Sequence, residues 1–170
     1  MKQLLLTAFL TLTLVACGES RKSTSDEGDA RSAQVAACPR ADENGNVDIA
    51  PGLTAHITHK GYGRTAVSGD HADVHTTLWL YDEDADGGRG TEIWSSGGSQ
   101  PFQFTLDSGQ VIKGWDLGVA CMLVGETRDL KIAPELGYGA RGKPPVPPNA
   151  TLLFEIELVR LTTPDLSLIH

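Results

Sequence analysis

The sequence predicts an α+β domain, in which an antiparallel β-sheet wraps around one short α-helix. Several short segments place their apolar residues at every second position, as strands with one buried face do. One segment instead repeats its apolar residues at helical spacing, and the chain contains no internal repeat. Several short strands together with a single brief helix indicate the α+β class.

The first predicted strands lie in the N-terminal half of the domain. Residues 53–58 alternate weakly and end at a Gly-Tyr-Gly turn signal, residues 61–63. Residues 71–81 alternate sharply, which predicts a strand with one buried face. That face carries Ala72, Val74, Thr76, Leu78 and Leu80.

The remaining predicted elements follow toward the C-terminus. A one-sided strand is marked by Phe102, Phe104 and Leu106, and residues 128–133 predict another. Between residues 114 and 122 a short amphipathic helix is predicted from the spacing of Trp115, Val119 and Met122. The last strand has an apolar face made of Leu152, Phe154, Ile156 and Leu158, with Glu155 and Glu157 on the opposite face.

Composition limits the class of protein. The chain has 170 residues, of which 40% are hydrophobic and 21% are charged, so it fits one globular domain plus an extra segment. Its formal net charge is -8 at pH 7. Because phosphate binding needs a basic surface, we exclude nucleic acid as a partner.

Residues 1–16 predict a targeting segment. Lys2 supplies a minimal charged region, and the apolar stretch of residues 4–15 is too short for a membrane span of about 20 residues, but it suits a signal peptide. Residues 14–17 (LVAC) match a bacterial lipobox, which predicts that Cys17 is lipidated and becomes the first residue of the mature chain. The alternative is an ordinary secretory signal with a cysteine near its cleavage site.

Four segments are therefore expected: the signal peptide, a lipidated flexible tether (residues 17–37), the folded domain (residues 38–163) and a C-terminal tail (residues 164–170). The tether is rich in small and charged residues and has almost no large apolar side chain, so it cannot offset its ordering entropy. We expect a lipid anchor in the bacterial cell envelope. Because Gly18 is not the aspartate of an inner-membrane retention signal, the outer membrane facing the periplasm is favoured.

Three runs of apolar and aromatic residues separated by glycines and prolines carry a family resemblance. They are VIKGW (residues 111–115), ELGYG (residues 135–139) and PPNATL (residues 147–152). In order and spacing they resemble the FKBP-type peptidyl-prolyl isomerases, and the similarity covers about residues 53–161. The resemblance implies an FKBP-like fold and an enzyme that accelerates rotation about X-Pro bonds without a cofactor.

The resemblance also implies the residues of a pocket. Those implied to be catalytic are Trp115, which forms the floor, and the wall residues Phe102, Tyr138 and Phe154. Those implied to bind substrate are Val111, Ile112, Thr76, Ile93, Trp94 and Val146. The backbone N–H of Ile112 and the hydroxyl of Tyr138 are expected to hold ligand carbonyls. Composition alone favours ordinary core residues at the aromatic positions.

Three positions depart from the family pattern. A tyrosine is usual where Thr76 stands, a phenylalanine where Ile93 stands, and an aspartate where Trp94 stands. The pocket is thus expected to lose a phenol, a wall aromatic and a buried carboxylate, and reduced catalysis follows as one reading. The loop of residues 143–146, which should overhang the pocket, is about one residue short of the family pattern.

Two further patterns suggest metal ions, and we favour neither. Residues 82–87 (DEDADG) resemble the start of a calcium loop, but the twelfth position is Ile93 instead of a glutamate, so a solvated hairpin tip is expected. His71 and His75 share a strand face but lie about 13 Å apart by strand geometry, too far for one zinc ion. No metal site is therefore predicted.

Cys38 and Cys121 remain once Cys17 is lipidated. In an oxidising compartment two thiols favour a disulfide, which would join the segment before the first strand to the short helix. The alternative is a buried Cys121 and an exposed Cys38.

Three functions remain open from the sequence. The first is a peptidyl-prolyl isomerase that assists the folding of exported proteins, with proline-containing polypeptides as substrates and macrolides as inhibitors. The second is a catalytically weak FKBP-like module that binds peptides, and the third is a purely structural surface lipoprotein. A monomer is expected, because the short helix offers no long dimerisation surface.

Overall fold

The computed structural model of the chain describes residues 35, 37–98 and 100–163. The predicted signal peptide, the lipidation site Cys17, nearly all of the tether and the C-terminal tail lie outside these residues. Within the described part of the chain, no helix has the length and apolar character needed to cross a membrane.

The described residues form one antiparallel sheet and one α-helix, which confirms the predicted α+β class. The strands run in the order β1-β2-β6-β7-β3-β4, and β5 also pairs with β3. Their bounds are β1 (Asn46–Ala50), β2 (Leu53–His59), β3 (His71–Tyr81), β4 (Arg89–Ser95), β5 (Phe102–Thr105), β6 (Thr127–Ile132) and β7 (Leu152–Thr162). The helices are α2 (Lys113–Val119) and three short 3₁₀ turns, η1 (Asp86–Gly88), η2 (Pro134–Leu136) and η3 (Gly139–Arg141).

The longest pairing in the sheet joins β3 and β7, whose alternation was plain in the sequence. Thr76 lies opposite Ile156 and Leu78 opposite Phe154, so the apolar faces of the two strands coincide. Val74 and Ile156 are both fully buried. A one-residue slip of either strand would turn this face to solvent, and the apolar pattern therefore specifies the register.

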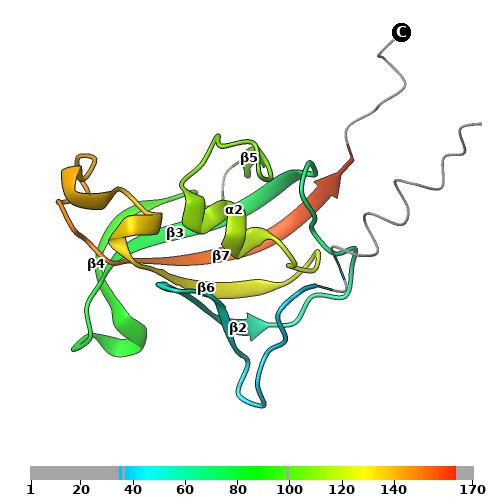
Figure 1. The fold of residues 1–170 in the computed structure, drawn as a ribbon, viewed down its shortest axis with the longest axis horizontal. Coiled ribbons are helices and arrows are strands. Elements are labelled where there is room, and N and C mark those ends of the chain that lie inside the picture. The colour runs from blue at the N-terminus through cyan, green and yellow to red at the C-terminus, as the bar shows by residue number, and fades with distance from the viewer. Residues whose placement is uncertain (1–34, 36, 99, 164–170) are drawn as a thin grey trace, which may run out of the picture.

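Helix α2 lies across the same face of the sheet, in front of β6 and β7 in Figure 1. A Cβ atom on Gly114 would lie 2.5 Å from Cγ2 of Ile132, and one on Gly118 would lie 2.5 Å from Cδ1 of Leu130. The two glycines are four residues apart and share one side of the helix. They allow the helix backbone to approach β6 more closely than any larger residue would.

The helix is shorter than the sequence suggested. It ends at Val119, because Ala120 has extended backbone angles (φ -54°, ψ 142°) and Cys121 has a positive φ of 67°. Met122 is nevertheless fully buried. Its apolar contact with the core, made from outside the helix, produced the apparent helical spacing.

A buried ion pair fastens the end of the helix to β6. Arg128 donates from Nε to Oε1 of Glu126 at 2.6 Å and from Nη1 to the carbonyl oxygen of Gly118 at 3.0 Å. The other carboxylate oxygen of Glu126 accepts the backbone N–H of Leu123 at 3.2 Å. Desolvation by burial lowers the pKa of Arg128, although the adjacent carboxylate opposes that shift. A pair this well satisfied holds the helix C-terminus in one position.

Cys38 and Cys121 form a disulfide across 83 residues of sequence. The bond joins the segment before β1 to the turn that follows α2. Closing so long a loop restricts the unfolded chain, which in the chain-entropy model stabilises the fold by about 4–5 kcal/mol.

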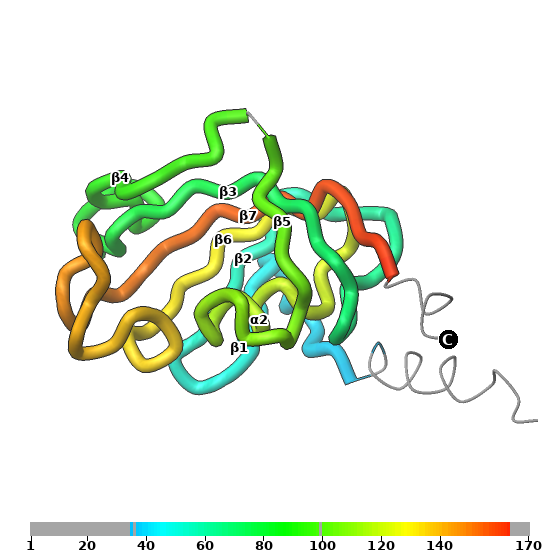
Figure 2. The backbone as a smooth tube through the Cα atoms, turned by 90° about the horizontal axis from the view of Figure 1, so that it is seen from above, coloured from blue at the N-terminus to red at the C-terminus, as the bar shows by residue number. Residues whose placement is uncertain are grey.

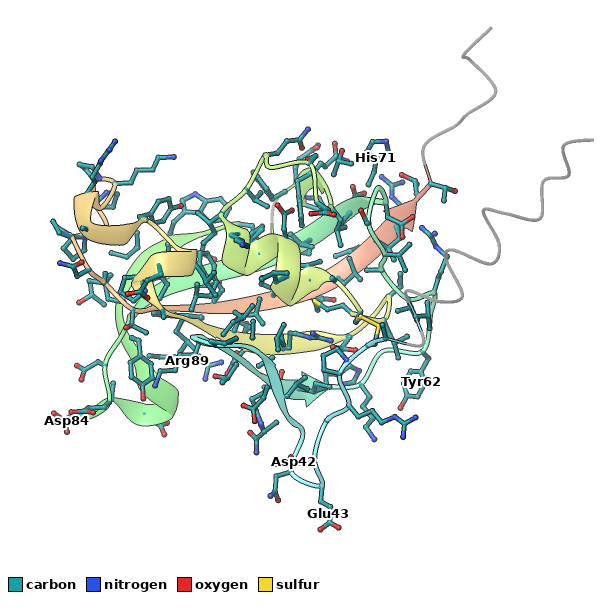
Figure 3. The ribbon with its side chains drawn as sticks, viewed as in Figure 1. Asp42, Glu43, Tyr62, His71, Asp84 and Arg89 are labelled. Carbon is teal, nitrogen blue, oxygen red and sulfur yellow. A yellow bond between two sulfur atoms is a disulfide. The ribbon has the colours of Figure 1, made fainter. Side chains whose placement is uncertain are left out.

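Strands β1 and β4 were missed by the sequence analysis. For β4 the reason is an irregular register with β3, which shifts between Leu78 and Trp79 and again before Tyr81. The segment before β4 forms the expected exposed acidic tip, where the N–H of Asp84 donates to Oδ1 of Asp82 at 3.1 Å (Figure 3).

Arg89, at the start of β4, ties this edge strand to the middle of the sheet. Its Nη2 atom donates to Asp129 on β6 at 2.9 Å and to Glu155 on β7 at 2.8 Å. Its guanidinium also lies 5.1 Å from the centre of the Trp79 ring. Charges and an aromatic face, and not apolar alternation, therefore position β4.

Replacing Arg128 by methionine should destabilise the fold by about 3–5 kcal/mol, because the carboxylate of Glu126 would stay buried without its partner. Urea unfolding measures the change. Arg160→Met is the matched control: the Arg160 side chain is 64% exposed, and the carboxylate of Asp73 keeps its hydrogen bond from Gln103, so the loss should be about 1 kcal/mol. Equal losses in the two variants would contradict the role given to Arg128.

Removing the disulfide with the double variant Cys38→Ala/Cys121→Ala should lower the unfolding free energy by about 4–5 kcal/mol. Reductant should reproduce the loss in the unaltered protein and have no effect on the double variant. An unchanged unfolding midpoint after reduction would show that the bond contributes nothing to the fold.

Candidate active site

Trp115 lies at the centre of an aromatic cluster that forms the floor of a cavity. It is only 5% exposed. Its ring centre lies 5.6 Å from that of Phe102 and 5.2 Å from that of Phe154, with interplanar angles of 87° and 79°. Phe104 approaches from a third side at 5.5 Å. Edge-to-face contacts of this kind are favourable and fix the orientation of the indole.

The cavity above this floor has a volume of about 580 Å³, within the range of small-molecule and peptide sites. Its walls come from β3, β4, β5, the segment before α2, the segment between β6 and β7, and β7. The lining residues are Leu78, Ile93, Trp94, Phe102, Gln110, Val111, Ile112, Trp115, Tyr138, Lys143, Pro144, Pro145, Val146 and Phe154. In Figures 1 and 2 the segment between β6 and β7, drawn in yellow to orange, lies at the same end of the sheet as β4.

Nine of the ten site residues expected from the sequence meet at this cavity: Trp115, Phe102, Tyr138, Phe154, Val111, Ile112, Ile93, Trp94 and Val146. Thr76 is the exception. It is 4% exposed, and its Oγ1 has no hydrogen-bond partner. The side chain of threonine ends inside the core, and Leu78, the next inward residue of β3, lines the cavity instead.

Five lining residues were not predicted as site residues: Leu78, Gln110, Lys143, Pro144 and Pro145. Leu78 and Gln110 gave no signal beyond ordinary core and loop character. The other three belong to the loop of residues 143–146, which was expected to overhang the pocket. Their place in that loop was the signal in the sequence that could have identified them as lining residues.

Ile93 and Trp94 are consecutive on β4, yet both line the cavity. In a regular strand their side chains would point to opposite faces. The irregular pairing explains this, because Leu78 lies opposite Trp94 whereas Trp79 lies opposite Glu92, which leaves Ile93 without a partner in register. This bulge turns two apolar residues toward one site. Trp94 is 48% exposed, so it forms the outer rim and leaves the cavity open.

Two polar groups at the cavity belong to residues that begin helices: the backbone N–H of Ile112 and the phenol of Tyr138. Ile112 is the N-cap of α2, with an extended backbone (φ -63°, ψ 150°), and its carbonyl oxygen accepts the N–H of Trp115 at 2.9 Å. N–H groups at this end of a helix have no acceptor within the helix. Tyr138 is the N-cap of η3 and is half-buried, and burial raises the pKa of its phenol.

The cavity contains little else that could react. The residues that line it include no carboxylate, histidine, cysteine or serine. Across the described residues, no group of three or more His, Cys, Asp or Glu side chains could hold a metal ion. Trp115 Nε1 is buried and makes no hydrogen bond within the described residues, so the floor presents mainly apolar ring surface to the cavity. This arrangement can bind and orient a ligand, and the titratable side chains in its lining are Tyr138 and Lys143.

The sequence profile of the FKBP-type peptidyl-prolyl cis-trans isomerases matches residues 62–159. FK506-binding protein 1 of Dictyostelium discoideum is 48% identical over 110 residues, which are 64% of this chain and 96% of the relative. An FK506-binding protein of Neisseria meningitidis is 45% identical over 112 residues, 65% of this chain and 96% of its own. The chain belongs to the FKBP-type peptidyl-prolyl isomerase family.

Larger relatives match through one part of their length. The rat peptidyl-prolyl cis-trans isomerase FKBP4 is 44% identical over 128 residues, which are 71% of this chain but 26% of the relative. The chain thus spans about a quarter of that relative. The shared region is the domain that carries the cavity.

The raised pKa of Tyr138 predicts that its phenol ionises above the ordinary value of about 10. Because the folded state favours the neutral phenol, ionisation should weaken folding as the pH rises past about 10. Ultraviolet titration of the tyrosinates measures this directly. Tyr138→Phe should remove a component that titrates above the ordinary value, and persistence of that component in the variant would contradict the assignment.

Proposed function

We propose that this chain is a peptidyl-prolyl cis-trans isomerase that accelerates rotation about X-Pro bonds. The observation that carries the proposal is the apolar cavity, with the indole of Trp115 held as its floor by Phe102 and Phe154. Membership of the FKBP-type family supports the same activity.

The reaction suits such a cavity. An amide C–N bond has partial double-bond character, and rotation about it meets a barrier of about 18–20 kcal/mol. In the twisted transition state resonance is lost, so the carbonyl is less polar than in either planar isomer. An apolar cavity that displaces water from the bound amide therefore favours the twisted state over the planar ones. No proton has to be transferred, which agrees with a lining that has no carboxylate or histidine.

Each residue has a role in this scheme. The proline ring would lie on Trp115, between the side chains of Phe102 and Phe154. The backbone N–H of Ile112 and the phenol of Tyr138 would donate to carbonyl oxygens on the two sides of the bond and select a bent substrate. Because Tyr138 stays protonated through neutral pH, its phenol remains a donor.

A second candidate is a module that binds peptides with weak catalysis. The observation that favours it is the rim at Ile93 and Trp94, where the family pattern has a phenylalanine and an aspartate. Trp94 supplies a large, half-exposed aromatic surface, which would add binding area but no polar group to orient the amide.

We also propose that the enzyme is a lipoprotein of the cell envelope. It is anchored through Cys17 and acts on the X-Pro bonds of exported polypeptides. The lipobox supports the anchor, and the Cys38–Cys121 disulfide supports an oxidising compartment. Radiolabelled palmitate should be incorporated by cells that express the full chain, and Cys17→Ser should abolish the label. A label that survives this substitution would exclude Cys17 as the site.

The two candidate functions are separated by exchange spectroscopy, which measures both binding and cis–trans rates of a proline tetrapeptide. We expect Phe102→Ala to lower kcat/KM by about tenfold or more, since it removes a wall worth about 1.5–3 kcal/mol of burial. Tyr62→Ala is the matched control: it is 90% exposed and does not line the cavity, so its rate should be unchanged.

A macrolide such as FK506 should compete with the peptide, because two relatives are named for binding it. Peptide binding without any increase in the exchange rate would overturn the enzymatic proposal and leave the binding module. Absence of both, in a protein whose near-ultraviolet circular dichroism shows fixed aromatic packing, would overturn both.

A further inference from the structure

The charge of the cavity differs from the charge of the chain. The net charge of the protein is -8, yet no carboxylate lines the site. Lys143 is the one charged residue in the lining. A ligand in the cavity therefore meets a single cation at close range.

Lys143 is fixed at the rim by its backbone. Its N–H donates to the carbonyl oxygen of Val146 at 3.0 Å, and its own carbonyl oxygen accepts the N–H of Val146 at 2.7 Å. This closed loop holds the residue beside the cavity while its side chain remains exposed. The Nζ atom lies 5.7 Å from the centre of the Tyr138 ring. The ammonium group is thus near the phenol that would hold a substrate carbonyl.

The ammonium group is not neutralised by the protein. Within the described residues Lys143 makes no ion pair, whereas Arg64, Arg89, Arg128 and Arg160 each do. The acids that directly adjoin lining residues in the sequence are Glu92, Asp116 and Glu155. None of them lines the cavity, and Glu155 is already paired with Arg89.

We propose that Lys143 gives the site a preference for substrates with an acidic side chain next to the proline. The inference rests on the proposed isomerase function and names the substrate class for it. One partly exposed ion pair changes a rate or affinity by about twofold to fivefold. The preference should weaken as salt is added, because exposed charges are screened.

The test compares kcat/KM of the full chain on peptides Ala-X-Pro-Phe and Ala-Leu-Pro-X, where X is Glu, Gln or Lys. Gln has the shape of Glu without its charge, so the Glu/Gln ratio isolates the electrostatic effect. In low salt we expect a Glu/Gln ratio of about two to five at one of the two positions, and a Lys/Gln ratio below one at the same position. Both ratios should approach one at high ionic strength.

Two variants assign the effect to Lys143. Lys143→Gln should bring the Glu/Gln ratio to one, and Lys143→Glu should invert it. Lys60→Gln is the matched control, because it removes the same charge from a residue that does not line the cavity. Lys60 follows His59, which pairs with Thr127 at the start of β6, whereas the loop of Lys143 follows the other end of that strand. Its ratio should equal that of the unaltered protein.

The outcomes separate the two proposals. If the neutral peptides are accelerated but the Glu/Gln ratio of kcat/KM is one at both positions, the preference is overturned and the isomerase function is kept. A preference that survives Lys143→Gln would overturn the assignment to this residue. Failure to accelerate any peptide would overturn the proposed function itself.

Discussion

The close approach of α2 to β6 is the constraint on which the rest of the site depends. Gly114 and Gly118 leave the helix backbone against Ile132 and Leu130, where even one methyl group would collide. Trp115 lies between the two glycines in sequence. The same close approach therefore places its indole on the buried face of the sheet, where it contacts the rings of Phe102 and Phe154. Arg128 then holds the end of the helix through the carbonyl of Gly118. The cavity floor is therefore a consequence of backbone contact, supported by a buried charge.

The walls depend on weaker and less regular interactions. The bulge in β4 turns Ile93 and Trp94 toward the cavity, and the position of β4 depends on the ion pairs of Arg89 on the far face of the sheet. A packed aromatic floor and a rim of mixed residues suit a site that accepts polypeptides of varied sequence. The floor would bind the common element, the proline ring, whereas the rim would meet the residues that vary. Lys143 is the rim residue through which this site differs most in chemistry from an uncharged aromatic pocket.

Much of this arrangement could be predicted from the sequence, for identifiable reasons. Strands β3 and β7 have one buried face each, and burial of alternate residues leaves a clear pattern. The floor and walls could be named because their residues lie in ordered glycine and proline runs that resemble a known family. Strand β4 gave no such pattern, since its bulge breaks the alternation and Arg89 holds it by charge. Thr76 was placed at the pocket by analogy with a larger residue, but a side chain this short ends in the core. Lys143 was expected only as part of the overhanging loop, because its importance as a charge follows from what the other lining residues lack, which only the assembled cavity shows.

The central claim is that a shaped, dry cavity accelerates amide rotation without proton transfer. The most direct test is the pH dependence of kcat/KM on a neutral proline peptide, measured in both H₂O and D₂O. The account predicts a flat profile between about pH 6 and pH 9, since Tyr138 remains protonated there, and a solvent isotope effect near one. A bell-shaped profile, or a rate about twofold or more slower in D₂O, would contradict it and require a titrating catalytic group.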